Sequence, residues 1–357
     1  MTKAGILTYH RASNYGALLQ AYALQSAIEK MGCDVEIIDY RCDGVENAHN
    51  PVKHILKFGL KGIYHAPYKL LKYIVCDSFR KHRLHLSEEA ECKTIAKVEN
   101  KYSILIAGSD QLWNDRLSEK DKQFFMPNER PLKKYTYAIS IGDFYDLQFL
   151  KDMLSDYGSN ISEISLREKT DQEIITSIIN KNCRVDVDPT FLLTKDDWDQ
   201  ISIKPKVEKK YVLIYIVPKP DHLIVKAEKY AKENGYEIVY LNNKSAKQRN
   251  LQKNRYSSPE EFLGWLNSAE CIFTNSFHGT ALSIIMEKPF FVETEYRGHT
   301  NKRIINLLND SGLEDRMIGK ENDDRFLTDI DWEKTKMNLN ININRSKKYL
   351  ENILNAN

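Results

Sequence analysis

The sequence predicts an α/β protein with two Rossmann-like lobes, each built on a parallel sheet. Short apolar runs alternate with helical patterns along the chain, which is typical of repeated βαβ units. Polar residues with glycine follow several of these runs, where the strands would end. A length of 357 residues is too great for one ordinary core and suggests two domains of about 150 to 200 residues each.

The first unit of this pattern is a strand at Gly5–Thr8, a polar loop, a helix over 17–31 and a second strand at Val35–Asp39. Apolar residues three and four positions apart give the helix one buried face. Gly32 suits the left-handed conformation that ends many helices. A strand–helix–strand unit of this length indicates parallel pairing.

Further apolar runs predict the rest of the first lobe, whose strands are expected at 102–107, 135–141, 161–166 and 184–187, with a helix near 170–180. The pattern restarts after Pro189, so the lobes are predicted at 1–193 and 194–357. In the second lobe, strands are predicted at 211–217, 236–241 and 271–275, and another begins near Pro289. We expect the two lobes to face a cleft, the usual ligand site of this architecture. A last helix is predicted at Ser346–Leu354, and its packing back on the first lobe is left open.

Residues 53–86 differ in composition from the rest of the first lobe. They contain one acid, Asp77, and many basic residues interleaved with aliphatic and aromatic ones: Lys53, Lys57, Lys61, Lys69, Lys72, Arg80, Lys81 and Arg83. We interpret the segment as one or two amphipathic helices inserted in the lobe. It is either a solvated helical cap or a basic surface for an anionic lipid-linked acceptor or the membrane face.

Composition excludes several classes of protein. The formal net charge of +2 argues against a nucleic-acid binder, which would carry a strong basic excess. The scattered cysteines form no CxxC or Cys/His cluster, and no group of carboxylates has metal-ligand spacing, so no metal site or cofactor is predicted. Neither a secretory signal nor a bilayer-spanning run is present, so we expect a cytoplasmic protein, with contact at the inner face of the membrane as an option for the basic segment.

His278 is the strongest candidate for chemistry. It lies in Ser276-Phe277-His278-Gly279-Thr280, which reads as a tight turn between a buried strand and a helix opening at Ala281. The amino end of a helix attracts phosphate, and glycine lets the backbone approach a ligand. A histidine at this position can donate to phosphate or act as a general acid near neutral pH. The alternative is a hydrogen-bonded core histidine.

Other candidates follow other predicted strands. Arg167 ends one strand, and its guanidinium suits carboxylates and phosphates, although pairing with neighbouring Glu168 is the plainer interpretation. Asp110 could accept a sugar hydroxyl, or cap a turn. Trp113 could stack on a sugar, or lie in the core. The first loop carries a group that would face the cleft: Asn14, Tyr15 and Gly16.

Several motifs occur together in one order along residues 5 to 316. They are Gly5-Ile6-Leu7-Thr8-Tyr9-His10, Asn14-Tyr15-Gly16-Ala17, Gly108-Ser109-Asp110-Gln111-Leu112-Trp113-Asn114, Ser165-Leu166-Arg167-Glu168-Lys169, Val187-Asp188-Pro189-Thr190 and Asn275-Ser276-Phe277-His278-Gly279-Thr280. Together they resemble the polysaccharide pyruvyl transferase family.

The resemblance implies a fold similar to GT-B glycosyltransferases. It implies transfer of a pyruvyl group from phosphoenolpyruvate to a sugar of a cell-surface polysaccharide or its precursor, forming a ketal. Phosphoenolpyruvate binding carries over to Arg167 and His278, with His278 also catalytic, and the donor site would include Ser276, Gly279 and Thr280. The acceptor would be a glycan or a lipid-linked oligosaccharide. Two rival interpretations are a GT-B-like glycosyltransferase using a nucleotide-sugar and a non-catalytic glycan-binding protein.

Overall fold

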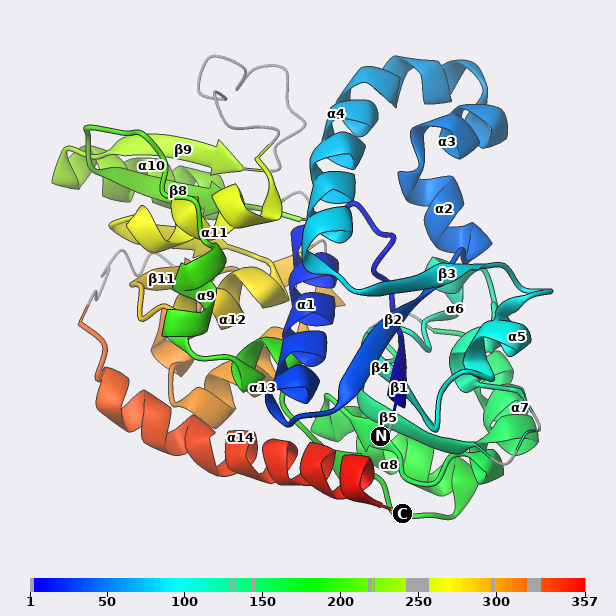
Figure 1. Cartoon of the computed structure of the whole chain (residues 1–357). Helices are drawn as coiled ribbons and strands as arrows, with labels where there is room; N and C mark the ends of the chain where they lie inside the picture. The colour runs from blue at the N-terminus through cyan, green and yellow to red at the C-terminus, as the bar shows by residue number, and fades with distance from the viewer. Residues whose placement is uncertain are drawn as a thin grey trace. The chain divides into compact units, whose positions relative to one another are not determined.

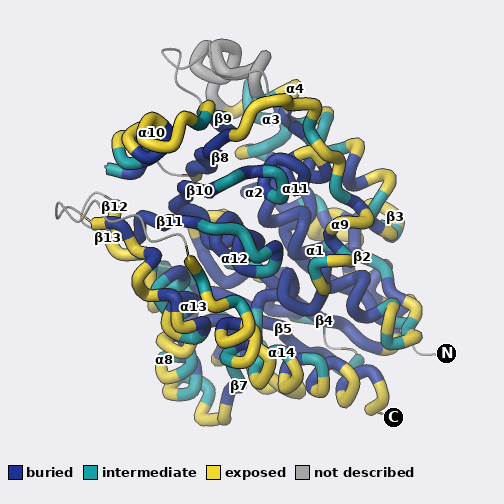
Figure 2. Tube along the Cα trace, turned by 90° about the vertical axis from the view of Figure 1, so that its left-hand side faces the viewer, coloured by how far each residue is buried: buried dark blue, intermediate teal, exposed yellow. Residues whose placement is uncertain are grey.

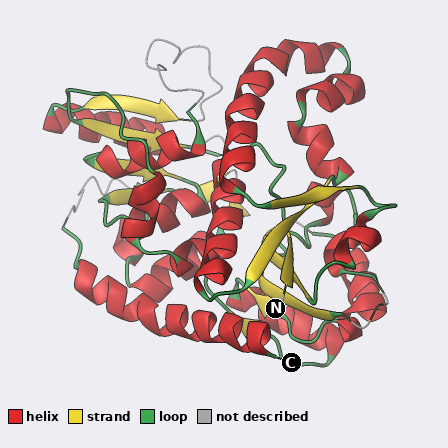
Figure 3. Cartoon of the chain, viewed as in Figure 1, coloured by secondary structure: helices red, strands yellow, loops and turns green. Residues whose placement is uncertain are grey.

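The computed structural model divides the chain into two compact units, Met1–Leu193 with Asn342–Asn357, and Thr194–Ile341. The structure describes residues 3–128, 130, 132–142, 145–217, 220, 222–241, 257–296, 299–319 and 329–356. Both units alternate strands with helices along the chain (Figure 3). The predicted helix over 346–354 is the end of a longer helix, α14 (Trp332–Asn355), which begins in the second unit and ends in the first.

The first unit is built on a parallel sheet of seven strands in the order β3-β2-β1-β4-β5-β6-β7. Their bounds are β1 Lys3–Leu7, β2 Asp34–Tyr40, β3 Leu86–Ala90, β4 Ile104–Asp110, β5 Lys133–Ile139, β6 Ser165–Leu166 and β7 Arg184–Val185. The strand order reverses between β1 and β4, and ligands bind such sheets outside the carboxyl ends of the strands at this reversal. β6 is shorter than its apolar run predicts, since only its last two residues pair as a strand.

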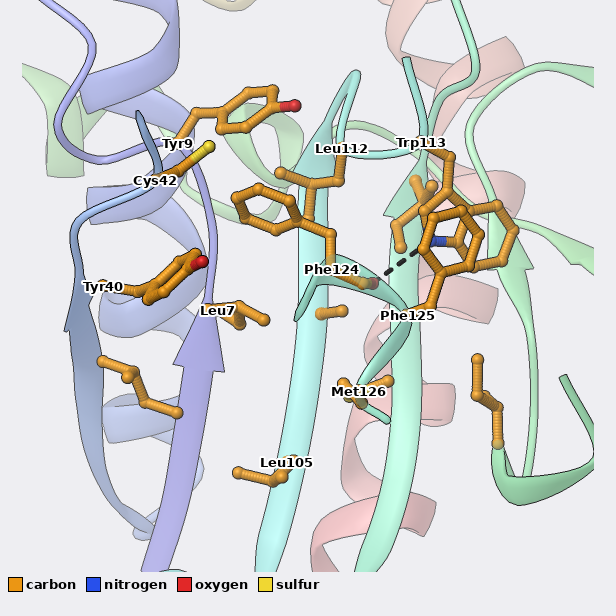
Figure 4. Close-up of a cluster of buried hydrophobic side chains, with 14 of the residues drawn as sticks. Leu7, Tyr9, Tyr40, Cys42, Leu105, Leu112, Trp113, Phe124, Phe125 and Met126 are labelled. Atoms are coloured by element: carbon orange, nitrogen blue, oxygen red, sulfur yellow. Dashed lines mark hydrogen bonds between the residues drawn. The ribbon is translucent and has the colours of Figure 1, made fainter. Parts of the chain in front are cut away.

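Helices cover both faces of this sheet (Figure 1). They are α1 Tyr15–Lys30, α2 Asp43–His49, α3 Pro51–Phe58, α4 Leu60–Arg83, α5 Ile95–Glu99, α6 Asp115–Ser118, α7 Leu147–Tyr157 and α8 Lys169–Ile179, with 3-10 turns at η1 Lys122–Phe125, η2 Gly158–Asn160 and η3 Pro189–Leu192. One face holds a cluster that joins Leu7 and Leu105 of the strands to Phe124 of η1 (Figure 4). Leu150 of α7 belongs to the same cluster. On α14, Tyr349 donates its hydroxyl to the Thr136 carbonyl of β5 at 3.0 Å.

The second unit has a smaller parallel sheet in the order β11-β10-β8-β9. Its strands are β8 Tyr211–Tyr215, β9 Glu237–Leu241, β10 Cys271–Thr274 and β11 Phe290–Val292, and a short antiparallel pair follows, β12 Glu295–Tyr296 with β13 His299–Thr300. Its helices are α9 Lys195–Ile201, α10 Leu223–Asn234, α11 Pro259–Ser268, α12 Phe277–Ile285 and α13 Lys302–Ser311, with a 3-10 turn at η5 Glu314–Arg316. Strand order reverses between β8 and β10, so this unit has a reversal point of its own.

Apolar strands that alternate with amphipathic helices explain why the chain folds this way. A strand buried on both faces reads as a continuous apolar run, and β8 and β10 are buried along their whole lengths (Figure 2). Ser258 and Glu261 form the predicted capping box of α11, in which the Ser258 hydroxyl accepts from the Glu261 N–H and the Glu261 carboxylate accepts from the Ser258 N–H.

Candidate functional site

The predicted donor-binding residues of the second unit lie together at the carboxyl edge of its sheet. Ser276, His278, Gly279 and Thr280 all follow β10, one of the two strands that flank the reversal. The turn predicted before the helix is instead the first turn of α12 itself, which begins at Phe277 rather than Ala281. Ser276 is the N-cap, since its hydroxyl accepts from the Gly279 N–H at 3.3 Å.

Gly279 holds the first turn of α12 close to the sheet. A Cβ added there would lie 2.5 Å from Thr274 Oγ1 and 2.9 Å from Tyr215 Cδ1, too close for a methyl group. The Thr274 hydroxyl donates to the Tyr215 carbonyl at 2.7 Å and accepts from the Ser276 N–H at 3.1 Å, which ties β8, β10 and the cap into one network. The amino end of α12 is therefore fixed at the reversal point.

His278 occupies the second position of α12 and is 8% exposed. Its ring meets the Phe277 ring edge-on, with 5.2 Å between ring centres. Because the helix dipole places partial positive charge at this end, an imidazole here is suited to an anionic ligand, to which it can donate a hydrogen bond or a proton.

Two further residues complete this edge: Asn275, which the sequence motif contains but to which no role was assigned, and Glu293, which the sequence analysis did not single out. Asn275 accepts the Val217 N–H at 3.0 Å through its side-chain oxygen, which joins the ends of β10 and β8. Glu293 follows β11, is buried, and accepts the backbone N–H groups of His222 at 2.8 Å and Leu223 at 3.3 Å. Glu293 thus caps α10 from 71 positions away, and no local sequence signal marks such a pairing.

Arg167 lies at the carboxyl edge of the first sheet, directly after β6, with 3% of its side chain exposed. Its Nε donates to Glu168 at 2.9 Å and its Nη1 donates to Asp188 at 2.8 Å. Although burial alone would lower it, the two carboxylates hold the pKa of Arg167 above its ordinary value. The guanidinium is therefore charged and already binds two carboxylates within its own unit.

Asp171 adds a third acid to this network. It lies in the first turn of α8, 7% exposed, and its carboxyl accepts the Ile141 N–H at 3.3 Å. Burial and the neighbouring Glu168 carboxylate raise the pKa of Asp171 to about 8. This raised pKa favours the protonated form of the buried Asp171 carboxyl, which lessens the negative charge around Arg167.

Asp110 ends β4, beside the reversal point of the first sheet, and has a φ of 82°. Left-handed backbone is uncommon outside glycine, although aspartate adopts it more readily than most residues, and such conformations concentrate at functional sites. The Asp110 carboxylate accepts the Gln111 N–H at 2.9 Å, so it also caps its own turn. The residue remains partly exposed, and its role as an acceptor contact stays a prediction.

The remaining candidates of the first unit lie mostly in packed positions. Trp113 is 1% exposed, stacks on Phe125 at 5.2 Å between ring centres and donates its indole N–H to the Phe124 carbonyl (Figure 4). This places Trp113 in the core, which corrects the sugar-stacking alternative. Asn14 is the N-cap of α1. Tyr15 is 1% exposed, with the Lys72 ammonium 3.6 Å from its ring centre, and Gly16 is buried in α1.

His10 is held in a separate buried network at the carboxyl ends of β1 and β2. Its Nε2 lies 2.9 Å from Asp39 Oδ1, and Arg11 donates to both carboxylate oxygens of Asp39. Burial lowers the pKa of His10, while the hydrogen bonds from His10 and Arg11 lower the pKa of Asp39 despite its burial. Within the described residues, no group of three His, Cys, Asp or Glu side chains is arranged to hold a metal ion. No helix in that part of the chain is both long and apolar enough to cross a bilayer.

Comparison with known proteins gives one family. The model of the polysaccharide pyruvyl transferase family matches residues 14–294, most of the chain. A search of curated protein sequences found no match.

Solved structures resemble the fold at low sequence identity. UDP-GlcNAc 2-epimerase from Methanocaldococcus jannaschii is 13% identical, with a TM-score of 0.50, over 96% of this chain and 93% of that chain. UDP-N-acetylglucosamine 2-epimerase from Rickettsia bellii is 10% identical, with a TM-score of 0.51, over 99% and 96%. These resemblances, with the two parallel sheets, confirm the predicted GT-B-like α/β class.

Proposed function

This chain belongs to the polysaccharide pyruvyl transferase family, and we propose that it transfers the pyruvyl group of phosphoenolpyruvate to a sugar of a cell-surface polysaccharide or its precursor. The observation that carries the proposal is the position of His278, in the first turn of α12 at the reversal between β8 and β10. A donor that bears a phosphate and a carboxylate suits the positive end of a helix. A reaction that needs proton transfer suits an imidazole.

The chemistry requires two bond-forming steps. One acceptor hydroxyl adds to C2 of the enol phosphate, losing its proton, while C3 gains a proton and becomes a methyl group. A second hydroxyl of the same sugar displaces phosphate from C2, so the products are a cyclic ketal and inorganic phosphate. His278 supplies the proton to C3 or to the departing phosphate, and the amino end of α12 stabilises the charge on that phosphate.

The assignment of Arg167 to the donor comes from the family resemblance. Its guanidinium already binds Glu168 and Asp188, so a donor anion has to share that guanidinium with the two carboxylates or replace one of them. His278 and Arg167 belong to different units, and each is tested separately.

A calorimetric titration with phosphoenolpyruvate tests the proposal. The wild-type protein should bind, and His278→Asn should weaken binding roughly tenfold to a hundredfold, the worth of a hydrogen bond to a charged group. His82→Asn is the matched control, because His82 is exposed on α4. Binding of a UDP-sugar without binding of phosphoenolpyruvate would overturn the proposal in favour of a nucleotide-sugar glycosyltransferase. Binding of a glycan alone, with no turnover, would favour a non-catalytic protein.

A further inference from the structure

The helices α3 and α4 carry an unusual concentration of positive charge. Residues 51–83 contain eight Lys and Arg and the single acid Asp77, a net charge of +7, whereas the whole chain carries +2. The remaining residues therefore carry a net charge of −5. Lys72 and Arg80 are buried, and without these two charges the net charge of the segment is still +5. This asymmetry favours an anionic partner at that place.

Aliphatic side chains on the same two helices are exposed. On α3, Val52 is 66% exposed and Leu56 is 80% exposed, one helical turn apart. On α4, Leu70, Leu71 and Ile74 are 48%, 43% and 51% exposed and share one face. The two helices pack against each other (Figures 1 and 2). We call these five aliphatic residues, with Lys53, Lys57 and Lys81, the apolar–basic surface.

The buried face of α4 shows that the exposed aliphatic residues are not simply core residues for which the interior has no room. That face contributes Cys76 and Phe79 to the interior, where Phe79 meets Tyr22 edge-on at 6.0 Å. It also buries Lys72 above Tyr15 and Arg80 beside Asp77. Charged residues thus occupy part of the buried face while leucine and isoleucine face outward, so burial within this unit does not account for the apolar positions.

The geometry points to an anionic lipid bilayer as the occupant of the apolar–basic surface. Exposed aliphatic side chains beside lysines are the pattern of a surface that lies on a membrane, with the apolar groups at the headgroup boundary and the ammonium groups on lipid phosphates. Lys53 and Lys57 pair in the structure with Asp43 and Glu119, whose side chains are 82% and 44% exposed. Exposed pairs of this kind contribute little, so lipid phosphates can replace them.

Vesicle flotation of the full chain tests this inference, and needs neither donor nor acceptor, so its result stands apart from the proposed reaction. The protein should float with phosphatidylglycerol vesicles, not with phosphatidylcholine vesicles, and added salt should weaken the binding. Lys53→Ala with Lys57→Ala should weaken partition roughly fivefold for each lysine near an anionic surface. Leu56→Glu with Ile74→Glu should abolish flotation.

The control pair is Val225→Glu with Ile341→Glu. These residues are 69% and 74% exposed on α10 and α14, so the control adds the same charge outside the apolar–basic surface and should float like the wild type. Substitutions at such exposed positions rarely disturb folding. No flotation at low salt, equal flotation with neutral vesicles, or flotation that the Leu56→Glu and Ile74→Glu pair leaves intact would each overturn the inference. The inference would also fail if the wild type bound no vesicles but formed a dimer that the Leu56→Glu and Ile74→Glu pair disrupts.

Discussion

The two parallel sheets present different chemistry at their carboxyl edges. The first sheet holds charged residues in closed networks, with Arg167 between Glu168 and Asp188 and His10 beside Asp39. The second sheet holds small polar groups, Thr274, Asn275 and Ser276, which fix the backbone around a helix start. Its one buried carboxylate among the residues described above, Glu293, accepts backbone N–H groups at the start of α10. Both edges follow the same topological rule, but within the residues that the structure describes, only the second has a histidine in the first turn of a helix.

This difference separates two ways of using polar residues. A buried charge must be paired, and its partner neutralises it. A neutral hydroxyl or amide can instead hold the backbone in place. The partial positive charge of the helix amino end then remains available to an anionic ligand. We therefore expect substitutions at the first edge to act mainly on stability, and substitutions at the second edge to act mainly on donor binding and turnover.

The largest expected effect on stability is that of Arg167→Ala. It leaves Glu168 and Asp188 buried without their cation, and breaking a buried pair in this way costs about 3–5 kcal/mol. Chemical denaturation measures this loss. Arg184→Ala is the control and should cost less, because the Arg184 side chain is 27% exposed and its partner Asp186 also accepts the hydroxyls of Ser165 and Ser346. If Arg167→Ala instead retained its stability and lost phosphoenolpyruvate affinity, Arg167 would belong with the second edge as a ligand-binding residue.

The second effect is on turnover. His278→Ala should lower phosphate release from phosphoenolpyruvate in the presence of acceptor at least about a hundredfold, the lower range for loss of a general acid. Its thermal unfolding should change little by comparison. The exposed His82→Ala is the control. A His278→Ala protein that turns over at the wild-type rate would show that the second edge does not carry the chemistry.

Local sequence signals predicted the strands of both parallel sheets except β3, because continuous apolar runs mark buried parallel strands. They also placed His278 after β10. The predicted start of α12, Ala281, was four residues too late. The sequence Ser276 to Thr280 is also typical of a turn, and only the hydrogen bond from the Gly279 N–H to the Ser276 hydroxyl identifies it as a helix cap. The sequence did not predict β3 or the buried face of α4. Both contain many polar residues, and they are ordered by pairing or packing with neighbouring elements that a local pattern does not reveal.

Long-range pairs set the limits of prediction at the site. Asp188 lies 21 residues from Arg167, and Glu293 lies 71 residues from His222. No spacing rule within one sequence joins such residues. Trp113 shows the converse problem, because the same residue type serves a core and a sugar platform, and only its contacts with Phe124 and Phe125 decide between them.

The third prediction tests whether close packing at Gly279 fixes the start of α12 at the second edge. Gly279→Ala places a methyl group 2.5 Å from Thr274 Oγ1 and should destabilise the protein by about 1–3 kcal/mol, as overpacking does. Donor affinity should fall with it, because the helix start must shift. Gly319→Ala is the matched control in the same unit, where the added Cβ meets nothing within 4 Å. Equal stability of the two variants would mean that the α12 start is not fixed by this contact.

For each pH unit, the smallest expected effect is the pH dependence that Asp171 gives to the first edge. Its pKa is about 8 in the folded protein and about 3.9 when unfolded, so folding takes up a proton between these values. The unfolded chain binds fewer protons there, and stability should therefore fall as pH rises from about 4 to about 8, by at most about 1.4 kcal/mol per pH unit.

Asp171→Asn removes this titration while its side-chain oxygen can still accept the Ile141 N–H. Denaturation at several pH values should show a shallower fall in stability than in the wild type, while the control Asp156→Asn, on the exposed side of α7, should keep the wild-type slope. An unchanged slope in Asp171→Asn would mean that Asp171 is ionised at neutral pH. The first edge would then carry three carboxylates against one guanidinium, and Arg167 would be held still more firmly within its own unit.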